Sequence, residues 1–538
     1  MWTFWPVVVT AFLAAFSLGP LQVRNGCNAP RAKGLVCRTS EIAPGPLDLD
    51  TVRKTEEHIL NDTMIKGAAI EELEWKEPGT NERARENRYP FSVGIVEYDD
   101  QGREWSGQQV DAVKKLVTDT LDASDALIVT FVHGWKNNCS TCNGNLACFR
   151  ETLALLSAVE DDLGPWVGGR PRPVIGIYIG WRGKTMRIPV ADSISAFSRK
   201  ATADQVGGRT SDLTSFLSWL NEKKVRANDQ AKSAASTSVS PRLTSPLGTR
   251  LVLVGHSFGA DVLFGAIAGH LNAQLGASEA YLKAQAGIPE AAGQGLAAKP
   301  MGDLAVLVNP ALEASAYHRF AADAGRTFRK GQLPLLITVQ ATNDQVTRVV
   351  FPIERALISL PGSTATREDY GSSLSTIGHF SPYFTHTLCQ PGKPGCSPAS
   401  TTVGPEALQR LGLPLKEVAK QEGTPRGNTP CGCDRFEASR DFHAIMLRTL
   451  RASLRQPAGY EHIGESMRPG ATDFEPLNAQ INVDSPFLVV RATPDVVDKH
   501  SGIYRPQFFD FLTNMLVREQ LLETPGVRER ARERVQSE

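Results

Sequence analysis

Five short apolar runs in the middle of the chain constrain the fold more than any other feature. They are rich in Val, Ile and Leu, which is the pattern of parallel strands that are buried on both faces of a sheet. Amphipathic stretches alternate with the runs, and this alternation predicts an α/β fold with a doubly wound, mostly parallel sheet. The runs span residues 127–132, 174–179, 251–254, 304–308 and 335–339.

The composition is that of a packed globular protein. Of the 538 residues, 41% are hydrophobic and 22% are charged, so a mostly disordered chain is not expected. Lys and Arg together number 58, as do Asp and Glu. Because the two charges balance, no overall field attracts the protein to a polyanion, and nucleic acid is not an expected partner.

The N-terminal segment carries no charged side chain before Arg24. We interpret residues 1–24 as a signal peptide or a membrane anchor, although a basic n-region and a clear small-x-small cleavage site are missing. The expected location is therefore outside the cytoplasm, either periplasmic or extracellular, or at a membrane through this segment. The alternative is a buried N-terminal helix.

The cysteines fall into local groups. Pairing within these groups suits an oxidising compartment, and because nine is an odd number at least one thiol is left over. A metal site built on Cys139 and Cys142 is the alternative, but no second C-x-x-C motif is present and no metal is expected. The groups are Cys27 and Cys37; Cys139, Cys142 and Cys148; Cys389 and Cys396; and Cys431 and Cys433.

The chain divides into a core and several additions. We expect an N-terminal lead-in with little core at residues 25–89, a first core part at 90–344, a cap or insertion at 345–485, and a second core part at 486–538. A last strand at 486–490 and a closing helix at 508–516 belong to that second part. Loops are expected at 226–248, 276–300 and 389–435, which are rich in small residues, Pro or Gly.

The segment 251–263 reads as a buried strand, the pentapeptide Gly255-His256-Ser257-Phe258-Gly259, and the start of a helix. The order matters more than the pentapeptide, because G-x-S-x-G alone arises often by chance. A serine nucleophile on a sharp strand-to-helix turn requires glycines where the backbone approaches too closely for a Cβ. A glycine-rich turn around a buried structural serine is the alternative.

This strand, turn and helix resemble the nucleophile elbow of the α/β-hydrolase superfamily, in its esterase and lipase branch. The resemblance covers residues 90–520 and implies a sheet with cap insertions, a catalytic triad and no cofactor. A serine in place of an aspartate argues against the dehalogenase and epoxide hydrolase branches. Ser257 is then the nucleophile.

The resemblance also implies an oxyanion loop. The run 127–132 ends in His133-Gly134-Trp135, which looks like the H-G-x loop of these hydrolases. The two oxyanion donors are expected to be the backbone amides of Trp135 and Phe258. His133 is expected to have a structural role, since it precedes the serine in the chain.

The acid follows the serine in the superfamily's order and stands after a later strand. Asp344 lies just beyond the run 335–339 and is the expected acid. Asp303 begins a strand, and Asp495 and Asp498 come too late in the chain, so all three are less suitable.

The base is expected on the loop after the last strand. His500 follows the apolar residues 487–492 and precedes the terminal amphipathic stretch. His379 is the second candidate. The long separation between Asp344 and His500 indicates an inserted segment between them.

Trp181 and Arg182 directly follow the run 174–179, at the strand ends where α/β proteins bind their substrates. They are candidate substrate-binding residues, with a packing role as the equal alternative. Nothing in the sequence identifies the acyl or alcohol group of a substrate.

The predicted activity is hydrolysis of carboxylic esters through an acyl-enzyme, with a small-molecule or lipid ester as substrate. A lipase or acyltransferase acting on membrane lipid is the first alternative, because the N-terminal segment would bring the enzyme to a membrane. A non-catalytic exported binding protein on a hydrolase scaffold is the second.

Overall fold

The structure is a computed structural model, and it describes a central sheet, the helices that pack on it and many of the connecting loops. The predicted leader 1–24, Arg182 and most of the predicted cap lie outside the described residues. The described residues are 35–42, 68–76, 88–135, 137–139, 143–166, 169–181, 192–235, 243–285, 295–299, 301–329, 332–352, 355, 366–389, 473–476, 485–505, 507–509, 511–513 and 515–516.

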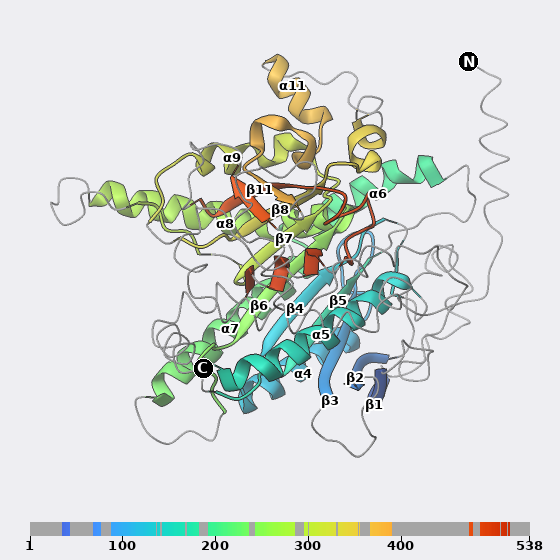
Figure 1. Cartoon of the computed structure of the whole chain (residues 1–538), viewed down its shortest axis with the longest axis vertical. Helices are drawn as coiled ribbons and strands as arrows, with labels where there is room; N and C mark the ends of the chain where they lie inside the picture. Colours follow the sequence, from blue (N-terminus) through green and yellow to red (C-terminus); the bar gives the residue numbers. More distant parts are fainter. Residues whose placement is uncertain are drawn as a thin grey trace, which may run out of the picture.

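Within that part of the chain the strands form one 11-stranded sheet, with the order β1-β2-β3-β5-β4-β6-β7-β8-β11-β9-β10 (Figure 1). From β3 to β9 every neighbouring pair is parallel, whereas β1, β2 and β10 pair antiparallel at the two edges. The strands are β1 Leu35–Ile42, β2 Ala68–Lys76, β3 Arg88–Glu97, β4 Leu127–Val132, β5 Val174–Gly180, β6 Arg250–His256, β7 Leu304–Val308, β8 Leu336–Ala341, β9 His386–Cys389, β10 Asp473–Pro476 and β11 Phe487–Ala492.

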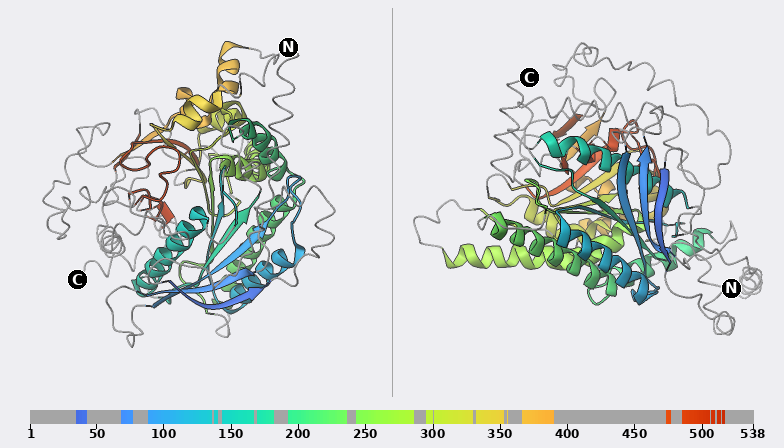
Figure 2. Two further views of the ribbon diagram at one scale, coloured as in Figure 1. Left: turned by 90° about the vertical axis from the view of Figure 1, so that its right-hand side faces the viewer. Right: turned by 90° about the horizontal axis from the view of Figure 1, so that it is seen from below.

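Helices cover both faces of the sheet (Figure 2). Alternate side chains of the central strands point to opposite faces, so each face forms its own apolar core. One core includes α5, and the other includes α4, α7, α8 and α9. The helices are α4 Gly107–Ala123, α5 Gly144–Trp166, α6 Asp192–Val206, α7 Asp212–Ala235, α8 Phe258–Ala284, α9 His318–Ala324 and α11 Arg367–Leu374, with short turns η4 Ala314–Tyr317, η5 Val346–Val350, η6 Ile377–His379 and η7 Ser381–Tyr383.

The strand order reverses at β4. The chain runs from β4 outward to β5 and then returns to β6 on the other side of β4. The helices α5 and α7 that precede and follow β5 pack on opposite faces, so the loops after β4 and β6 diverge there. In open α/β sheets, the crevice at such a switch point, at the carboxyl ends of the strands, is where ligands bind.

The predicted α/β architecture is confirmed, and each of the five apolar runs forms a parallel strand of the sheet. The described residues between 507 and 516 are helical, as expected for the closing helix.

Two of the expected loops are partly helical, and the predicted lead-in contains two strands. The lead-in 25–89 supplies β1 and β2, which extend the sheet, and Leu73 of β2 is fully buried. The loop expected at 226–248 begins as the last ten residues of α7, and the loop expected at 276–300 begins as the end of α8. Alanine has the highest helix propensity of all residues, so Ala-rich sequence continues a helix as readily as it forms a loop.

Part of the predicted insertion 345–485 also belongs to the sheet. Within it, β9 pairs with β11 and β10 pairs with β9, while η5, α11, η6 and η7 lie beyond β8. The remaining role of this range as a cap stays a prediction.

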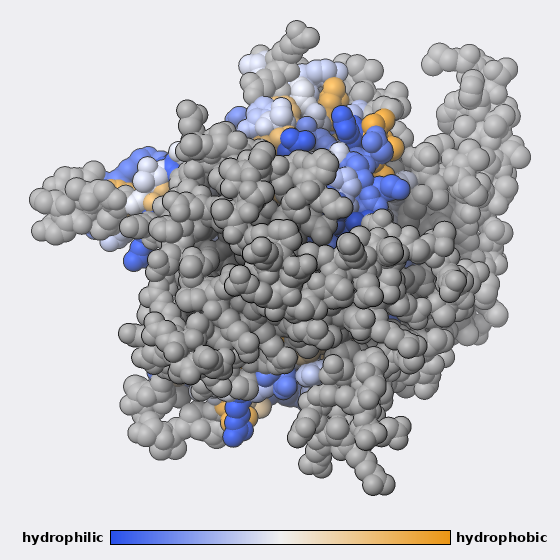
Figure 3. Space-filling view, in the orientation of Figure 1, coloured by the Kyte–Doolittle hydropathy of each residue, from blue (hydrophilic) through white to orange (hydrophobic). Residues whose placement is uncertain are grey.

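On the face shown in Figure 3, the described residues form small hydrophobic spots among hydrophilic ones. Among the helices that the structure describes, none combines the length and the apolar character that crossing a membrane requires. Cys139 is a buried thiol, and Cys148 and Cys389 are disulfide-bonded. Pairing within the local groups and export remain predictions.

Candidate active site

Ser257 occupies a sharp turn between β6 and α8. Its backbone has φ 59° and ψ −128°, a conformation that costs an L-residue free energy and that surrounding contacts must hold. The Ser257 amide donates to the Val308 carbonyl at 3.0 Å, and the Ser257 carbonyl accepts from the Ala260 amide at 3.0 Å. The turn therefore holds the serine at the carboxyl edge of the sheet.

The glycines around the turn stand where no side chain fits. A Cβ on Gly255 would lie 2.6 Å from the Gly259 carbonyl oxygen, and a Cβ on Gly259 would lie 2.3 Å from the Val132 carbonyl oxygen. Both distances are shorter than real Cβ contacts. The two glycines of the pentapeptide thus allow β6, α8 and the end of β4 to approach one another.

Ser257, His500 and Asp344 form a continuous hydrogen-bonded chain. The Ser257 Oγ lies 2.8 Å from His500 Nε2, and His500 Nδ1 lies 2.8 Å from Asp344 Oδ2. The residues come from the ends of β6, β8 and β11, and β8 and β11 are parallel neighbours. The structure thus brings together the three residues that the sequence singled out.

Asp344 is fully buried and heavily hydrogen-bonded. Oδ2 accepts from the Thr347 hydroxyl at 2.7 Å and from Gln340 Nε2 at 3.1 Å, and Oδ1 accepts from the Val346 amide at 2.9 Å. Burial alone would raise the pKa of Asp344, but its hydrogen bonds with His500 and Thr347, and the interaction with the His500 charge, bring it down to about 2. The carboxylate therefore stays ionised above acidic pH.

The loop that carries His500 is fixed through its backbone. His256 Nε2 donates to the His500 carbonyl at 2.8 Å, and Asn309 Nδ2 donates to the carbonyls of Lys499 and His500 at 3.0 and 2.9 Å. Asn309 is fully buried, has φ 47°, and its Oδ1 accepts from the Ala341 amide at 2.8 Å. Asn309 thus links the His500 loop to the end of β8.

Asn309, Gln340 and Thr347 were not among the residues predicted from the sequence. Asn309 directly follows the buried run 304–308, so a polar residue at the end of a buried strand was the available signal. Gln340 and Thr347 flank Asp344 in the sequence, but no local pattern marks their hydrogen bonds to it.

The loop after β4 lies against Ser257. A Cβ on Gly134 would lie 2.7 Å from both the His256 carbonyl oxygen and the Ser257 Cβ, so the backbone there touches the elbow. Phe258 is the first residue of α8, and its amide donates no hydrogen bond to any described residue. Helix N-terminal amides attract negative charge, so this amide suits an oxyanion.

His133 has the structural role that was expected. Its Nε2 accepts from the Trp181 amide at 3.2 Å, and the Trp181 indole donates to the His133 carbonyl at 2.7 Å. The two rings stack with 5.8 Å between centroids. Burial lowers the pKa of His133 to about 4, so the ring is neutral at neutral pH.

Of the two roles considered for Trp181, substrate binding and packing, the structure shows the packing role. Its side chain is fully buried against His133 and cannot line an open pocket. Arg182, the other candidate for substrate binding, lies outside the described residues. Farther along that part of the chain, Lys200 of α6 lies 2.9 Å from Asp261, which is in the first turn of α8.

The alternative acids have other partners. Asp303 lies 3.0 Å from Lys224 Nζ and accepts from the Leu251 amide at 2.7 Å, so it fixes the start of β6. Asp498 lies 3.3 Å from Arg505. Of the described acidic residues, Asp344 is the one that is hydrogen-bonded to the His500 ring.

His379, the alternative base, is linked to Asp344 through Thr347. His379 Nε2 is 3.1 Å from Thr347 Oγ1, and the hydrogen bonds found for its ring do not include Ser257. Burial lowers the pKa of His379 to about 4. This histidine therefore belongs to the surroundings of Asp344.

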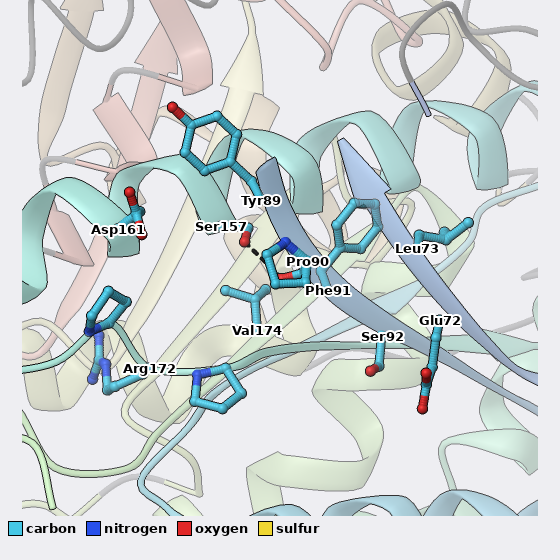
Figure 4. Close-up of a pocket in the computed structure, with 12 residues that line it drawn as sticks. Glu72, Leu73, Tyr89, Pro90, Phe91, Ser92, Ser157, Asp161, Arg172 and Val174 are labelled. Carbon is cyan, nitrogen blue, oxygen red and sulfur yellow. Dashed lines mark hydrogen bonds between the residues drawn. The ribbon is translucent and has the colours of Figure 1, made fainter. Parts of the chain in front are cut away.

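A cavity of 320 Å³ lies away from these residues (Figure 4). Its lining includes Tyr89 and Pro90 at the start of β3, Val174 at the start of β5, and Ser157 of α5, whose hydroxyl donates to the Pro90 carbonyl at 2.8 Å. It therefore opens at the amino ends of the parallel strands, opposite the edge that holds Ser257, and it is not the candidate active site.

No cluster of metal-ligating side chains is present among the described residues. Comparison of the chain with protein-family models, with curated proteins and with solved structures found no match.

Proposed function

We propose that this protein is a serine hydrolase of the α/β-hydrolase type that cleaves carboxylic esters. The observation that carries the proposal is the chain of 2.8 Å contacts from Ser257 to His500 and from His500 to Asp344. The strained turn at Ser257 adds support, since backbone strain of this kind accumulates at functional positions. The strand order and the helices on both faces are compatible with the fold of this superfamily.

In the proposed mechanism, His500 Nε2 takes the proton of Ser257 as the oxygen attacks the ester carbonyl. Asp344 holds Nδ1–H and stabilises the imidazolium that forms. The amides of Trp135 and Phe258 stabilise the oxyanion. His500 then gives its proton to the leaving alcohol, and water, deprotonated by the same ring, releases the acid and frees Ser257.

The experiment that tests this proposal is labelling of the full chain with a fluorophosphonate, followed by mass spectrometry of the adduct. We expect a stoichiometric adduct on Ser257 that is lost in Ser257→Ala and strongly slowed in His500→Ala and Asp344→Ala. His318→Ala is the matched control, because His318 is an exposed histidine on α9. A folded protein that gives no adduct, or one on another residue, contradicts the proposal.

The choice between an esterase and a lipase or acyltransferase depends on the substrate. Turnover of esters from short to long acyl chains, with and without vesicles, distinguishes the two. A non-catalytic binding protein would have no need of the triad contacts, and the close approach of all three side chains favours catalysis.

A further inference from the structure

A second cavity has a polar wall and lies near Asp344, because one of its lining residues, Gln340, is hydrogen-bonded to Asp344. Its volume is 260 Å³, and Arg348, His379, Gln340 and Arg491 contribute to its wall. Arg348 belongs to η5, which follows Asp344, and Arg491 belongs to β11, which precedes the His500 loop. The cavity is large enough for a small polyatomic ion.

The two arginines give the cavity an unbalanced positive charge. Both side chains are exposed, and neither forms an ion pair with a described carboxylate. The Arg491 guanidinium lies 5.1 Å from the centroid of the Phe384 ring, which also lines the cavity. Among the described lining residues, none is acidic. Guanidinium groups in this situation bind oxyanions through paired N–H donors.

Gln340, which contributes to the cavity wall, has a buried acceptor without a donor. Gln340 is 1% exposed, and its Nε2 has three acceptors within hydrogen-bonding distance for its two protons: Asp344 Oδ2, Thr347 Oγ1 at 3.0 Å and Asn309 Oδ1 at 3.2 Å. These acceptors fix the orientation of the Gln340 amide. Its Oε1 atom therefore points away from them and lies against the backbone of Gly378. Oε1 has no donor among the described residues, and a buried acceptor without a donor destabilises the fold.

We propose that this cavity binds a phosphate group that keeps one proton, as inorganic phosphate or as part of a phosphate monoester. The charged oxygens lie at Arg348 and Arg491, and the P–OH group donates to Gln340 Oε1. A fully deprotonated ion supplies no such donor, and a neutral alcohol leaves both arginines without an anion. The combination of two cations and one acceptor selects for a protonated oxyanion.

The cavity is connected to the acid through Thr347. Because the single hydroxyl proton of Thr347 goes to Asp344 Oδ2, His379 Nε2 donates to Thr347 Oγ1 when this nitrogen carries a proton. An anion next to His379 strengthens this donation by favouring the protonated ring. Phosphate in the cavity therefore acts on the residue that orients His500.

The test is phosphate binding to the full chain, measured by isothermal titration calorimetry and by the shift in melting temperature. Arg348→Gln with Arg491→Gln is expected to weaken phosphate binding by about tenfold or more, since two charged hydrogen-bond donors are lost. The matched control is Arg226→Gln with Lys232→Gln, which removes the same charge from exposed positions of α7. It is expected to bind phosphate as the wild type does.

The measurement needs no turnover, so it is independent of the proposed hydrolase activity, and Ser257→Ala should bind phosphate unchanged. No binding to the wild type, or equal binding to both double variants, overturns the proposal. Two sources of the phosphate are separated by kinetics. If the group belongs to the substrate, the arginine variant loses kcat/KM for a phosphorylated ester and keeps it for the neutral ester. If it is a separate ligand, phosphate binds without competing with the ester.

Discussion

Asn309 connects three parts of the candidate site, so its replacement gives a stringent test of how His500 is positioned. Asn309→Ala removes four hydrogen bonds, two to the carbonyls of Lys499 and His500 and two from the Ala341 amide and Gln340. At about 1 kcal/mol for each bond, the loss is about 4 kcal/mol. The left-handed backbone, with φ 47°, adds about 1 kcal/mol for alanine.

The assay has two parts. Urea unfolding gives the loss of stability, and Asn309→Gly, which has no Cβ, should be more stable than Asn309→Ala by about 1 kcal/mol. Labelling of Ser257 by a fluorophosphonate reports the position of the His500 ring. We expect the labelling rate to fall between about tenfold and a hundredfold, because the His500 carbonyl keeps His256 as its remaining donor.

Asn343→Ala is the control for this experiment. Asn343 accepts from the Lys499 amide at 2.8 Å and donates to Asp498 at 2.8 Å, so it holds the same loop without a bond to His500. Its labelling rate should stay close to that of the wild type. If Asn309→Ala labels within threefold of the wild type, the side chain of Asn309 does not position the base, and our interpretation of this network is wrong.

Three further predictions concern the same edge of the sheet. Gly134→Ala places a Cβ 2.7 Å from Ser257 Cβ, so we expect fluorophosphonate labelling to slow by about a hundredfold or more; labelling at the wild-type rate would contradict the close approach. Thr347→Val removes the hydroxyl that donates to Asp344 Oδ2 at 2.7 Å. The Asp344 carboxylate then keeps more of its negative charge to stabilise the His500 imidazolium. The acid limb of the kcat/KM profile should move up by about one pH unit, whereas a purely structural role would leave the limb in place. Because burial lowers the pKa of His133 from 6.5 to about 4, the unfolded chain takes up this proton first as pH falls. The contribution of His133 to the free energy of unfolding is complete above pH 6.5 and declines by about 3 kcal/mol toward pH 4. Urea unfolding of the wild type and of His133→Gln at several pH values should give a smaller decline for the variant.

The central strands could be predicted because strands buried on both faces leave a continuous apolar run in the sequence. The antiparallel strand β2 could not be predicted in this way, because its sequence includes Glu71, Glu72 and Glu74. Glu71 is buried there, since Arg150 of α5 lies 2.9 Å away. An ion pair between residues 79 positions apart leaves no local pattern, so charge alone suggested a solvated segment.

The same distinction applies to the candidate site. Ser257, Asp344 and His500 each follow an apolar run, and the order of residues in the superfamily that the sequence resembles pointed to all three. Asn309, Gln340 and Thr347 matter through contacts that depend on how β7, β8 and the last loop meet in space. Short helical turns such as η5 and η6, which carry Thr347 and His379, are too brief to leave a periodic signal.

Because β8 pairs with β11, the distance between Asp344 and His500 does not depend on the length of the segment between them. Asp344 and His500 are 156 residues apart, yet each follows a strand that is bonded to the other in register, from Phe487 opposite Leu336 to Ala492 opposite Ala341. Doubling the length of a flexible connection costs only about 0.6 kcal/mol of closure entropy. The intervening segment can therefore be longer or shorter at little cost in closure entropy, while Asp344 and His500 keep their separation.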